Sequence, residues 1–214
     1  MNSPIVFVVT GADHIPHIQP IVKRERYIEY MLSLHKIFSY HYPVAGVISE
    51  INRDDTTDCP PFEQFPFTTL KILYQGELDS YNKSTREFIS IVSLLSDLPP
   101  IADDTFIVKI SGRYMIVNDT FITTIQHNIE QKEIVAFIRT NEQHTAQYTF
   151  LYAMRYRYFK QFYEQSIQMF DTGESIEYIL FRYLKNNNLL QYTVQINELG
   201  ILTNINNSGT FTIY

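Results

Sequence analysis

The first quarter of the chain places the tightest limit on its fold. Residues 5–9 form a continuous apolar run rich in β-branched side chains, and Thr10 and Gly11 end it. Residues 24–40 then carry apolar side chains at helical spacing, and residues 44–49 form a second apolar run. A fully apolar run is typical of a strand that is buried on both faces of a parallel sheet. The order strand, helix, strand therefore predicts a right-handed crossover that joins two parallel strands.

Strand-like and helix-like segments alternate along the rest of the chain. Strands are predicted at residues 68–74, 106–110, 134–139 and 210–214, with residues 114–117 as an extension of the strand at 106–110. Helices are predicted at residues 84–96, 119–129, 155–170 and 175–184. No internal repeat or change of composition marks a domain boundary. The pattern predicts one α/β domain over residues 1–214, with a mixed, mainly parallel central sheet flanked by helices.

Composition and charge argue against several classes of protein. Of the 214 residues, 45% are hydrophobic, which is enough to bury a sizeable core. The net charge of −6 argues against a general affinity for nucleic acid or anionic membranes, but it allows a local cationic pocket for a small phosphate ligand. No apolar run has the length of a membrane span or the form of a signal sequence. With its single cysteine, Cys59, the chain is expected to be a soluble cytoplasmic protein.

The segment FIVKISGRY, residues 106–114, predicts an anion site at one edge of the sheet. A buried strand leads here into Lys109, Ser111, Gly112, Arg113 and Tyr114. Glycine permits close approach of the backbone, and lysine and arginine supply the charge-assisted donors that phosphate requires. Open α/β sheets bind ligands at the carboxyl ends of their strands, where these residues would lie. The alternative is a strand and a β-turn whose lysine and arginine are only solvated.

Residues at the starts of two predicted helices are candidates for the same ligand. Arg26 lies near the start of the first helix, and Asn82 and Lys83 precede the helix at residues 84–96. The N-terminus of a helix attracts anions, so positive charge placed there suggests a bound anion. The alternative for Arg26 is a solvated helix end. The alternative for Asn82 and Lys83 is an ordinary N-terminal cap by Ser84, with Glu87 completing a capping box.

Two groups of carboxylates are candidates for chemistry. Glu177 lies at the start of the helix at residues 175–184, where it could act as a general base, although the helix dipole alone also favours acidic residues there. Glu77 and Asp79 follow the third strand and could bind Mg²⁺ or Mn²⁺. The acidic pair at residues 103–104 precedes a strand, which is the wrong end of the sheet for the predicted anion site.

Aromatic residues are concentrated in the helix predicted at residues 155–170. Phe159, Phe162 and Tyr163 share one face of this helix, which is expected to pack on the sheet. Tyr156 and Tyr158 do not both join that face. They are therefore candidates for an exposed surface on which an acceptor sugar stacks.

The order of these segments resembles a GT-A type glycosyltransferase domain of the nucleotide-diphospho-sugar transferase superfamily. Residues 26–34 resemble the R-x-x-x-Y-x-x-S-L helix with which that fold opens. Residues 82–87 and 109–114 resemble N-K-G-x-x-E and K-(L/I)-(T/S)-G-R-Y, patterns of a group of capsule- and envelope-glycan transferases that is also seen in large DNA viruses. Residues 173–177 and 200–209 resemble that group's rear helix and closing region. Ser84 departs from the pattern, since it replaces the usual glycine.

The resemblance implies a function and a donor. It implies an enzyme that moves a sugar from a nucleotide-diphosphate sugar, such as a UDP-sugar, to a hydroxyl of a surface or envelope glycan. The reaction would take place in the cytoplasm, or in the cytoplasm of the host cell if the protein is viral. Thr10, Gly11 and Glu50, at the ends of the first two strands, would contact the nucleotide. Glu177 would deprotonate the acceptor in an inverting mechanism.

The resemblance also has implications for the metal. The family's acidic D-x-D motif is absent after the strand at residues 106–110. Lys109 and Arg113 would then neutralise the diphosphate where a metal usually does so, and Glu77 and Asp79 are the fallback ligands for Mn²⁺ or Mg²⁺.

Two other functions stay open at this point. A nucleotidyltransferase shares the fold but attacks an α-phosphate, and it normally carries a glycine-rich loop after the first strand, where this chain has only Gly11. A non-catalytic module that binds a glycan or a protein through aromatic side chains is the alternative from a different class.

Overall fold

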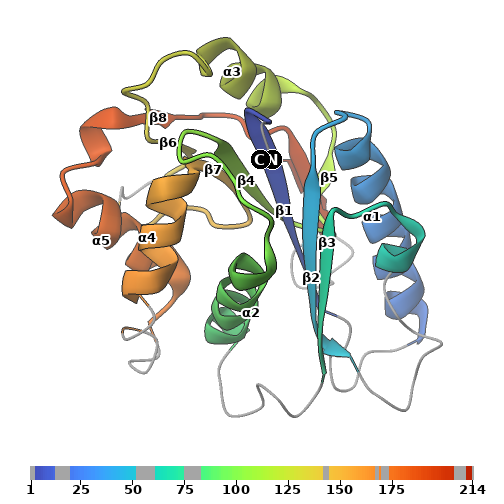
Figure 1. Cartoon of the computed structure of the whole chain (residues 1–214). Coiled ribbons are helices and arrows are strands. Elements are labelled where there is room, and N and C mark those ends of the chain that lie inside the picture. The colour runs from blue at the N-terminus through green and yellow to red at the C-terminus, as the bar shows by residue number, and fades with distance from the viewer. Residues whose placement is uncertain are drawn as a thin grey trace.

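The apolar runs of the sequence form the central sheet of a computed structural model, which describes residues 3–12, 20–51, 61–74, 83–141, 145–166, 169, 174–204 and 211–213. The sheet has seven strands in the order β3-β2-β1-β4-β7-β6-β8 (Figure 1). These strands are β1 (Ile5–Ala12), β2 (Val44–Ile51), β3 (Thr69–Tyr74), β4 (Phe106–Ser111), β6 (Ala136–Ile138), β7 (Leu151–Arg155) and β8 (Thr193–Gln195). The helices are α1 (Pro20–Phe38), α2 (Lys83–Asp97), α3 (Thr120–Asn128), α4 (Tyr156–Ser166) and α5 (Ile176–Asn186).

The direction of the strands confirms the prediction of a mixed, mainly parallel sheet. β1 to β4 all run parallel, whereas β7 runs antiparallel to both of its neighbours, β4 and β6. The side chains of residues 5–9 in the central β1 have no exposed surface, which explains why this run is uniformly apolar. Thr10 lies opposite Ser111, and Ala12 lies opposite Ser49. The carboxyl ends of β1, β2 and β4 therefore meet at one edge of the sheet.

Helices cover both faces of the sheet, and each face has its own core (Figure 1). Tyr30, Leu34 and Ile37 of α1 are buried on one face, at the spacing of successive helical turns. On the other face, α2, α4 and α5 bury a second cluster that includes Phe88 and Phe162, whose rings meet edge to face at 6.0 Å. Among the described helices, none is long and apolar enough to cross a membrane.

The chain leaves the central sheet directly after β4, which corrects the expectation that residues 114–117 extend that strand. The amide of Tyr114 donates to the carbonyl of Ser111 at 3.0 Å, so a turn closes here. Residues 115–116 then form β5 (Met115–Ile116) in a second sheet of order β10-β9-β5, with β9 (Ile201–Asn204) and β10 (Phe211–Ile213). The sequence analysis predicts no strand at β7, β8 or β9: β8 and β9 are short and lack a clear apolar pattern, and residues 151–155 lead directly into the aromatic run of α4.

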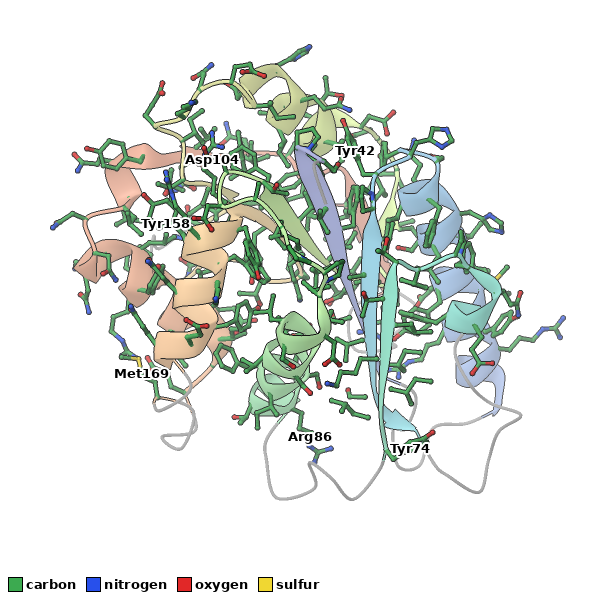
Figure 2. All side chains as sticks on the ribbon, viewed as in Figure 1. Tyr42, Tyr74, Arg86, Asp104, Tyr158 and Met169 are labelled. Carbon is green, nitrogen blue, oxygen red and sulfur yellow. The ribbon has the colours of Figure 1, made fainter. Side chains whose placement is uncertain are left out.

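The aromatic helix α4 follows the prediction on one face only. Phe159, Phe162 and Tyr163 are fully buried, as expected from their spacing. The start of α4 lies at the edge where β4 begins, because the amide of Tyr156 donates to the carbonyl of Thr105 at 2.7 Å. Figure 2 shows Tyr158 at the same end of the molecule as Asp104 and far from Arg86. The start of α4 therefore lies at the opposite edge of the sheet from the carboxyl ends of the parallel strands, and the acceptor surface at Tyr156 and Tyr158 stays a prediction.

Phe159→Ala is expected to lower the free energy of unfolding by about 3 kcal/mol, because it leaves a cavity in a fully buried aromatic cluster. Tyr158→Ala, at a half-buried position on the same helix, is the matched control and should cost less than half as much. Urea denaturation of both variants measures the difference. Equal losses of unfolding free energy in the two variants would contradict the assignment of Phe159, and not Tyr158, to the face of α4 that stabilises the core.

Candidate functional site

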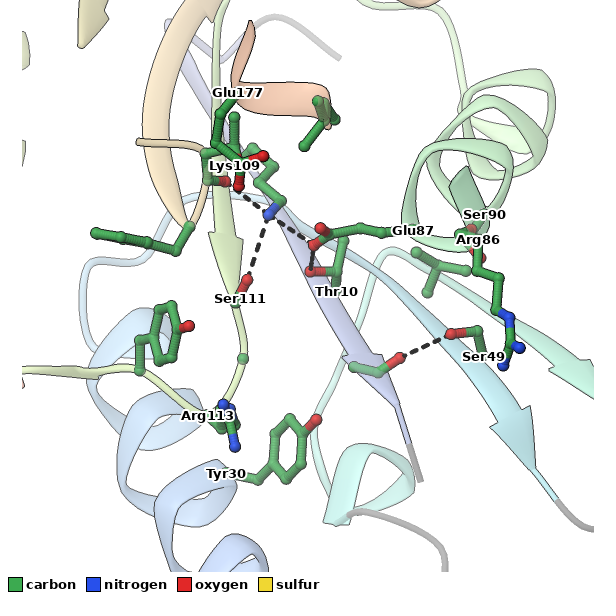
Figure 3. A pocket seen from close by; sticks show the side chains of 17 residues that line it. Thr10, Tyr30, Ser49, Arg86, Glu87, Ser90, Lys109, Ser111, Arg113 and Glu177 are labelled. Carbon is green, nitrogen blue, oxygen red and sulfur yellow. Dashed lines mark hydrogen bonds and ion pairs between the residues drawn. The ribbon is translucent and has the colours of Figure 1, made fainter. Parts of the chain in front are cut away.

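A cavity of about 220 Å³ opens where the carboxyl ends of β1, β2 and β4 meet (Figure 3). Its walls also include the middle of α1, at Tyr30, the first turns of α2 and α5, and the segment that precedes β7. The lining residues are Thr10, Gly11, Tyr30, Val47, Ser49, Arg86, Glu87, Ser90, Lys109, Ser111, Gly112, Arg113, Tyr114, Thr149, Phe150, Ile176 and Glu177.

The structure brings most of the predicted site residues to this one cavity. Thr10, Gly11, Lys109, Ser111, Gly112, Arg113, Tyr114 and Glu177 all line it. Arg26 is not a lining residue, and only the backbone of Glu50 and Lys83 is described, at the end of β2 and the start of α2. Asn82, Glu77 and Asp79 lie outside the described residues, as do Gly173 and residues 205–209 of the closing region.

Lys109 lies at the base of the cavity and forms an ion pair with Glu87. Its ammonium nitrogen is 2.7 Å from Oε1 of Glu87, and the exposed fractions of the two side chains are 1% and 27%. The hydroxyl of Thr10 donates to the same Oε1 at 2.7 Å. This ion pair therefore connects the ends of β1 and β4 with the first turns of α2 (Figure 3).

All three donors of the Lys109 ammonium point at acceptors within the protein. Besides Glu87, it donates to the carbonyl of Thr149 at 2.7 Å and to the hydroxyl of Ser111 at 3.3 Å. This arrangement differs from the expectation that Lys109 donates directly to a ligand phosphate. Because its charge is neutralised by Glu87, Lys109 organises the base of the cavity, and Arg113 and Arg86 are the other cations that line it.

Glu177 enters the cavity from the first turn of α5 and is held by Thr149. The hydroxyl of Thr149 donates to Oε1 of Glu177 at 2.9 Å. The backbone amide of Gln147 also donates to the carbonyl of Glu177, at 3.2 Å. Within the described part of the chain, Oε2 of Glu177 has no hydrogen bond, so it can accept a proton from a ligand in the cavity.

The two glycines of the site allow close packing within the protein. A Cβ atom on Gly112 would lie 2.9 Å from Cγ1 of Val9 and 3.0 Å from Cε1 of Tyr30. A Cβ atom on Gly11 would lie 2.8 Å from Cζ of Phe62. Any other residue at these positions would force Val9, Tyr30 or Phe62 to shift, so both glycines also serve the packing of α1 and of the segment around Phe62 against the strand ends.

Arg26 belongs to a group of charges beside the cavity. Burial raises the pKa of Glu29, and the nearby charges of Arg113 and Arg26 partly offset this shift. Burial also lowers the pKa of Arg26, and Arg113 lowers it further. These interactions place Arg26 and Glu29 of α1 close to Arg113, which follows β4. Two arginines and a buried carboxylate therefore interact on this side of the cavity.

The carboxylates of the described residues are few around the cavity. The described residues contain no group of three or more His, Cys, Asp or Glu side chains that could hold a metal ion. Of the carboxylates that line the cavity, Glu87 is already paired with Lys109. Ser111, Gly112 and Arg113 stand at the end of β4, and none of them supplies a carboxylate. The fallback ligands Glu77 and Asp79 stay a prediction, because they lie outside the described residues.

Sequence reasoning missed about half of the lining residues, including Tyr30, Ser49, Arg86, Ser90, Thr149, Phe150 and Ile176. In the sequence, Glu87 belongs to a capping box and to the N-K-G-x-x-E resemblance, and neither pattern identifies it as the partner of Lys109. The sequence gives less indication that Thr149 lines the cavity, because Thr149 reaches it only through the antiparallel direction of β7.

No protein-family model matches the chain, and no curated protein matches it. Several solved structures do resemble it. A protein from Desulfovibrio desulfuricans G20, assigned as a nucleotide-diphospho-sugar transferase, superposes with a TM-score of 0.54 and 11% identity over 91% of this chain and 80% of that one. The 2-C-methyl-D-erythritol 4-phosphate cytidylyltransferase of Francisella tularensis gives 0.51 and 8%, over 89% of each chain.

Mouse xyloside xylosyltransferase 1 superposes with a TM-score of 0.50 and 9% identity, over 89% of this chain and 85% of that one. The structural neighbours thus include both glycosyltransferases and a nucleotidyltransferase, and each superposition covers about nine-tenths of this chain. This protein therefore has the GT-A-like α/β fold of the nucleotide-diphospho-sugar transferases.

Proposed function

We propose that this protein is a glycosyltransferase that moves a sugar from a nucleotide-diphosphate sugar to a hydroxyl group of an acceptor. The observation that carries this proposal is the cavity at the carboxyl ends of β1, β2 and β4, where Arg113 and Glu177 line one space. Ligands of open α/β sheets bind at this edge. A cation and a carboxylate in the same cavity suit a reaction that expels a diphosphate and removes a proton.

The proposed reaction uses Arg113 and Glu177 in different roles. The acceptor oxygen forms a bond to the anomeric carbon of the donor, and the bond from that carbon to the diphosphate oxygen breaks. Negative charge develops on the leaving diphosphate, where Arg113 stabilises it. The acceptor proton passes to Oε2 of Glu177, whose Oε1 is held by Thr149. Thr10 and Gly11, at the end of β1, would contact the nucleotide.

The acceptor that we propose is a hydroxyl of a surface or envelope glycan that is assembled in the cytoplasm. This choice rests on the resemblance of residues 109–114 to the K-(L/I)-(T/S)-G-R-Y pattern.

Arg113→Ala is expected to weaken the binding of a nucleoside diphosphate by about 1.5–3 kcal/mol, because a charge-assisted hydrogen bond is lost. Lys185→Ala removes an exposed cation from the far end of α5 and is the matched control. Titration calorimetry in EDTA and in Mn²⁺ measures both affinities. Unchanged affinity of Arg113→Ala would contradict the phosphate site. Binding only in the presence of Mn²⁺ would indicate instead a metal site at Glu77 and Asp79.

A screen of UDP-, GDP- and CMP-sugars tests the function itself. Binding to the native state raises the melting temperature by mass action, and release of the nucleotide shows turnover. A nucleotidyltransferase is the second candidate, because the cytidylyltransferase superposes over 89% of both chains. An enzyme of that class would join a sugar phosphate to the α-phosphate of a nucleoside triphosphate and release pyrophosphate. Binding of glycans without turnover of either substrate would identify a binding module.

A further inference from the structure

Thr149 connects the two parts of the site that the sequence predicts separately. Its carbonyl accepts a hydrogen bond from Lys109 at 2.7 Å, and its hydroxyl donates to Glu177 at 2.9 Å. Its exposed fraction is 3%. One buried residue thus lies between the ion pair at the base of the cavity and the carboxylate on α5.

We propose that Thr149 is a positioning residue for the carboxylate of Glu177, and that Lys109 holds Thr149 in place. This inference rests on the proposed function, in which Glu177 accepts the proton of the acceptor hydroxyl. Two hydrogen bonds fix the position of Glu177, one from the Thr149 hydroxyl to Oε1 and one from the Gln147 amide to the backbone carbonyl.

The hydrogen bond from Thr149 determines how the carboxylate of Glu177 is oriented. A glutamate side chain has several rotatable bonds, and a half-exposed carboxylate can turn freely unless one oxygen is held. With Oε1 held, Oε2 keeps one direction relative to the cavity. Proton transfer requires a base within hydrogen-bond distance in the correct orientation. Thr149 therefore affects turnover through Glu177, and Lys109 supports it by fixing the Thr149 backbone.

Thr149→Val and Thr149→Ser separate the hydroxyl from the shape of the side chain. Valine removes the donor with little change in volume, and it should lower kcat about tenfold while the KM for the donor stays within about twofold. Serine keeps the donor and should restore kcat to within about twofold of wild type. Thr105→Val is the matched control, because Thr105 is also buried and donates its hydroxyl to a backbone carbonyl, that of Ser3 at 2.9 Å. It lies before β4, at the other edge of the sheet.

A double-mutant cycle with Glu177→Gln decides whether Thr149 acts through Glu177. If it does, Thr149→Val causes no further loss of kcat once Glu177 is glutamine, as single-turnover assays can measure. A tenfold loss that persists in the Glu177→Gln background would overturn the inference while the proposed function stands. Absence of sugar transfer by the wild-type protein with every nucleotide-sugar would overturn the function, and the inference with it.

Discussion

Lys109→Met is expected to lower the free energy of unfolding by about 3–5 kcal/mol, which is the usual cost of removing one partner of a buried ion pair. The lysine side chain is 1% exposed, and its ammonium contacts Glu87, Thr149 and Ser111. Methionine fills a similar volume but leaves Glu87 without its cation and the Thr149 carbonyl without its donor. Urea denaturation followed by circular dichroism gives the loss directly.

The double variant Lys109→Met with Glu87→Leu tests whether the charge causes this loss. Replacing both members of a buried ion pair by apolar residues is often close to neutral, because neither charge is then left uncompensated. The double variant should therefore recover most of the stability that Lys109→Met loses. If the double variant is no more stable than the single one, packing around the lysine stem, and not the ion pair, holds this part of the fold together.

Glu177→Gln is expected to lower kcat by a factor of about 10²–10⁴, the usual scale for the loss of a general base. Glutamine keeps the shape of the side chain and can still accept the hydrogen bond from Thr149, but it cannot take the acceptor proton. Binding of the donor should be unchanged, because the diphosphate is assigned to Arg113. Turnover of a nucleotide-sugar with acceptor, together with calorimetry of the nucleoside diphosphate, separates these effects.

Glu164→Gln on α4 is the control for the loss of a carboxylate, because its exposed side chain pairs only with Lys160 on the same helix in the described structure. It should have wild-type activity. Near-wild-type turnover in Glu177→Gln would show that Glu177 is an ordinary glutamate of a helix start. Products that retain the anomeric configuration of the donor would also remove the need for this base.

The parts of the fold that were predicted correctly are those in which burial requires a recognisable pattern of apolar residues. The run at residues 5–9 is apolar at every position because β1 is covered on both faces, and the alternation of helices and strands followed from similar local patterns. β5 was assigned to the wrong sheet, because the turn that closes at Tyr114 depends on a hydrogen bond and not on a hydrophobic pattern. β8 pairs with β6 at the edge of the sheet and carries little apolar signal.

The candidate site was predicted where several chemical groups follow a strand directly, as at residues 109–114. The role of Lys109 could not be read from the sequence, because its partner Glu87 lies on a different element and was accounted for by helix capping. Thr149 was missed for a similar reason, since its contacts reach 40 residues back to Lys109 and 28 residues forward to Glu177.

The distance along the chain between Lys109, Thr149 and Glu177 has a consequence for the order in which the site is assembled during synthesis. Thr149 and Phe150 reach the cavity at the start of that strand, whereas the parallel strands contribute residues at their ends. Lys109 thus leaves the ribosome 40 residues ahead of the carbonyl that it binds, and 68 residues ahead of Glu177 (177 − 109). The ribosome therefore adds the residues of the base before those of the opposite wall, and the cavity is complete only after α5 has been made.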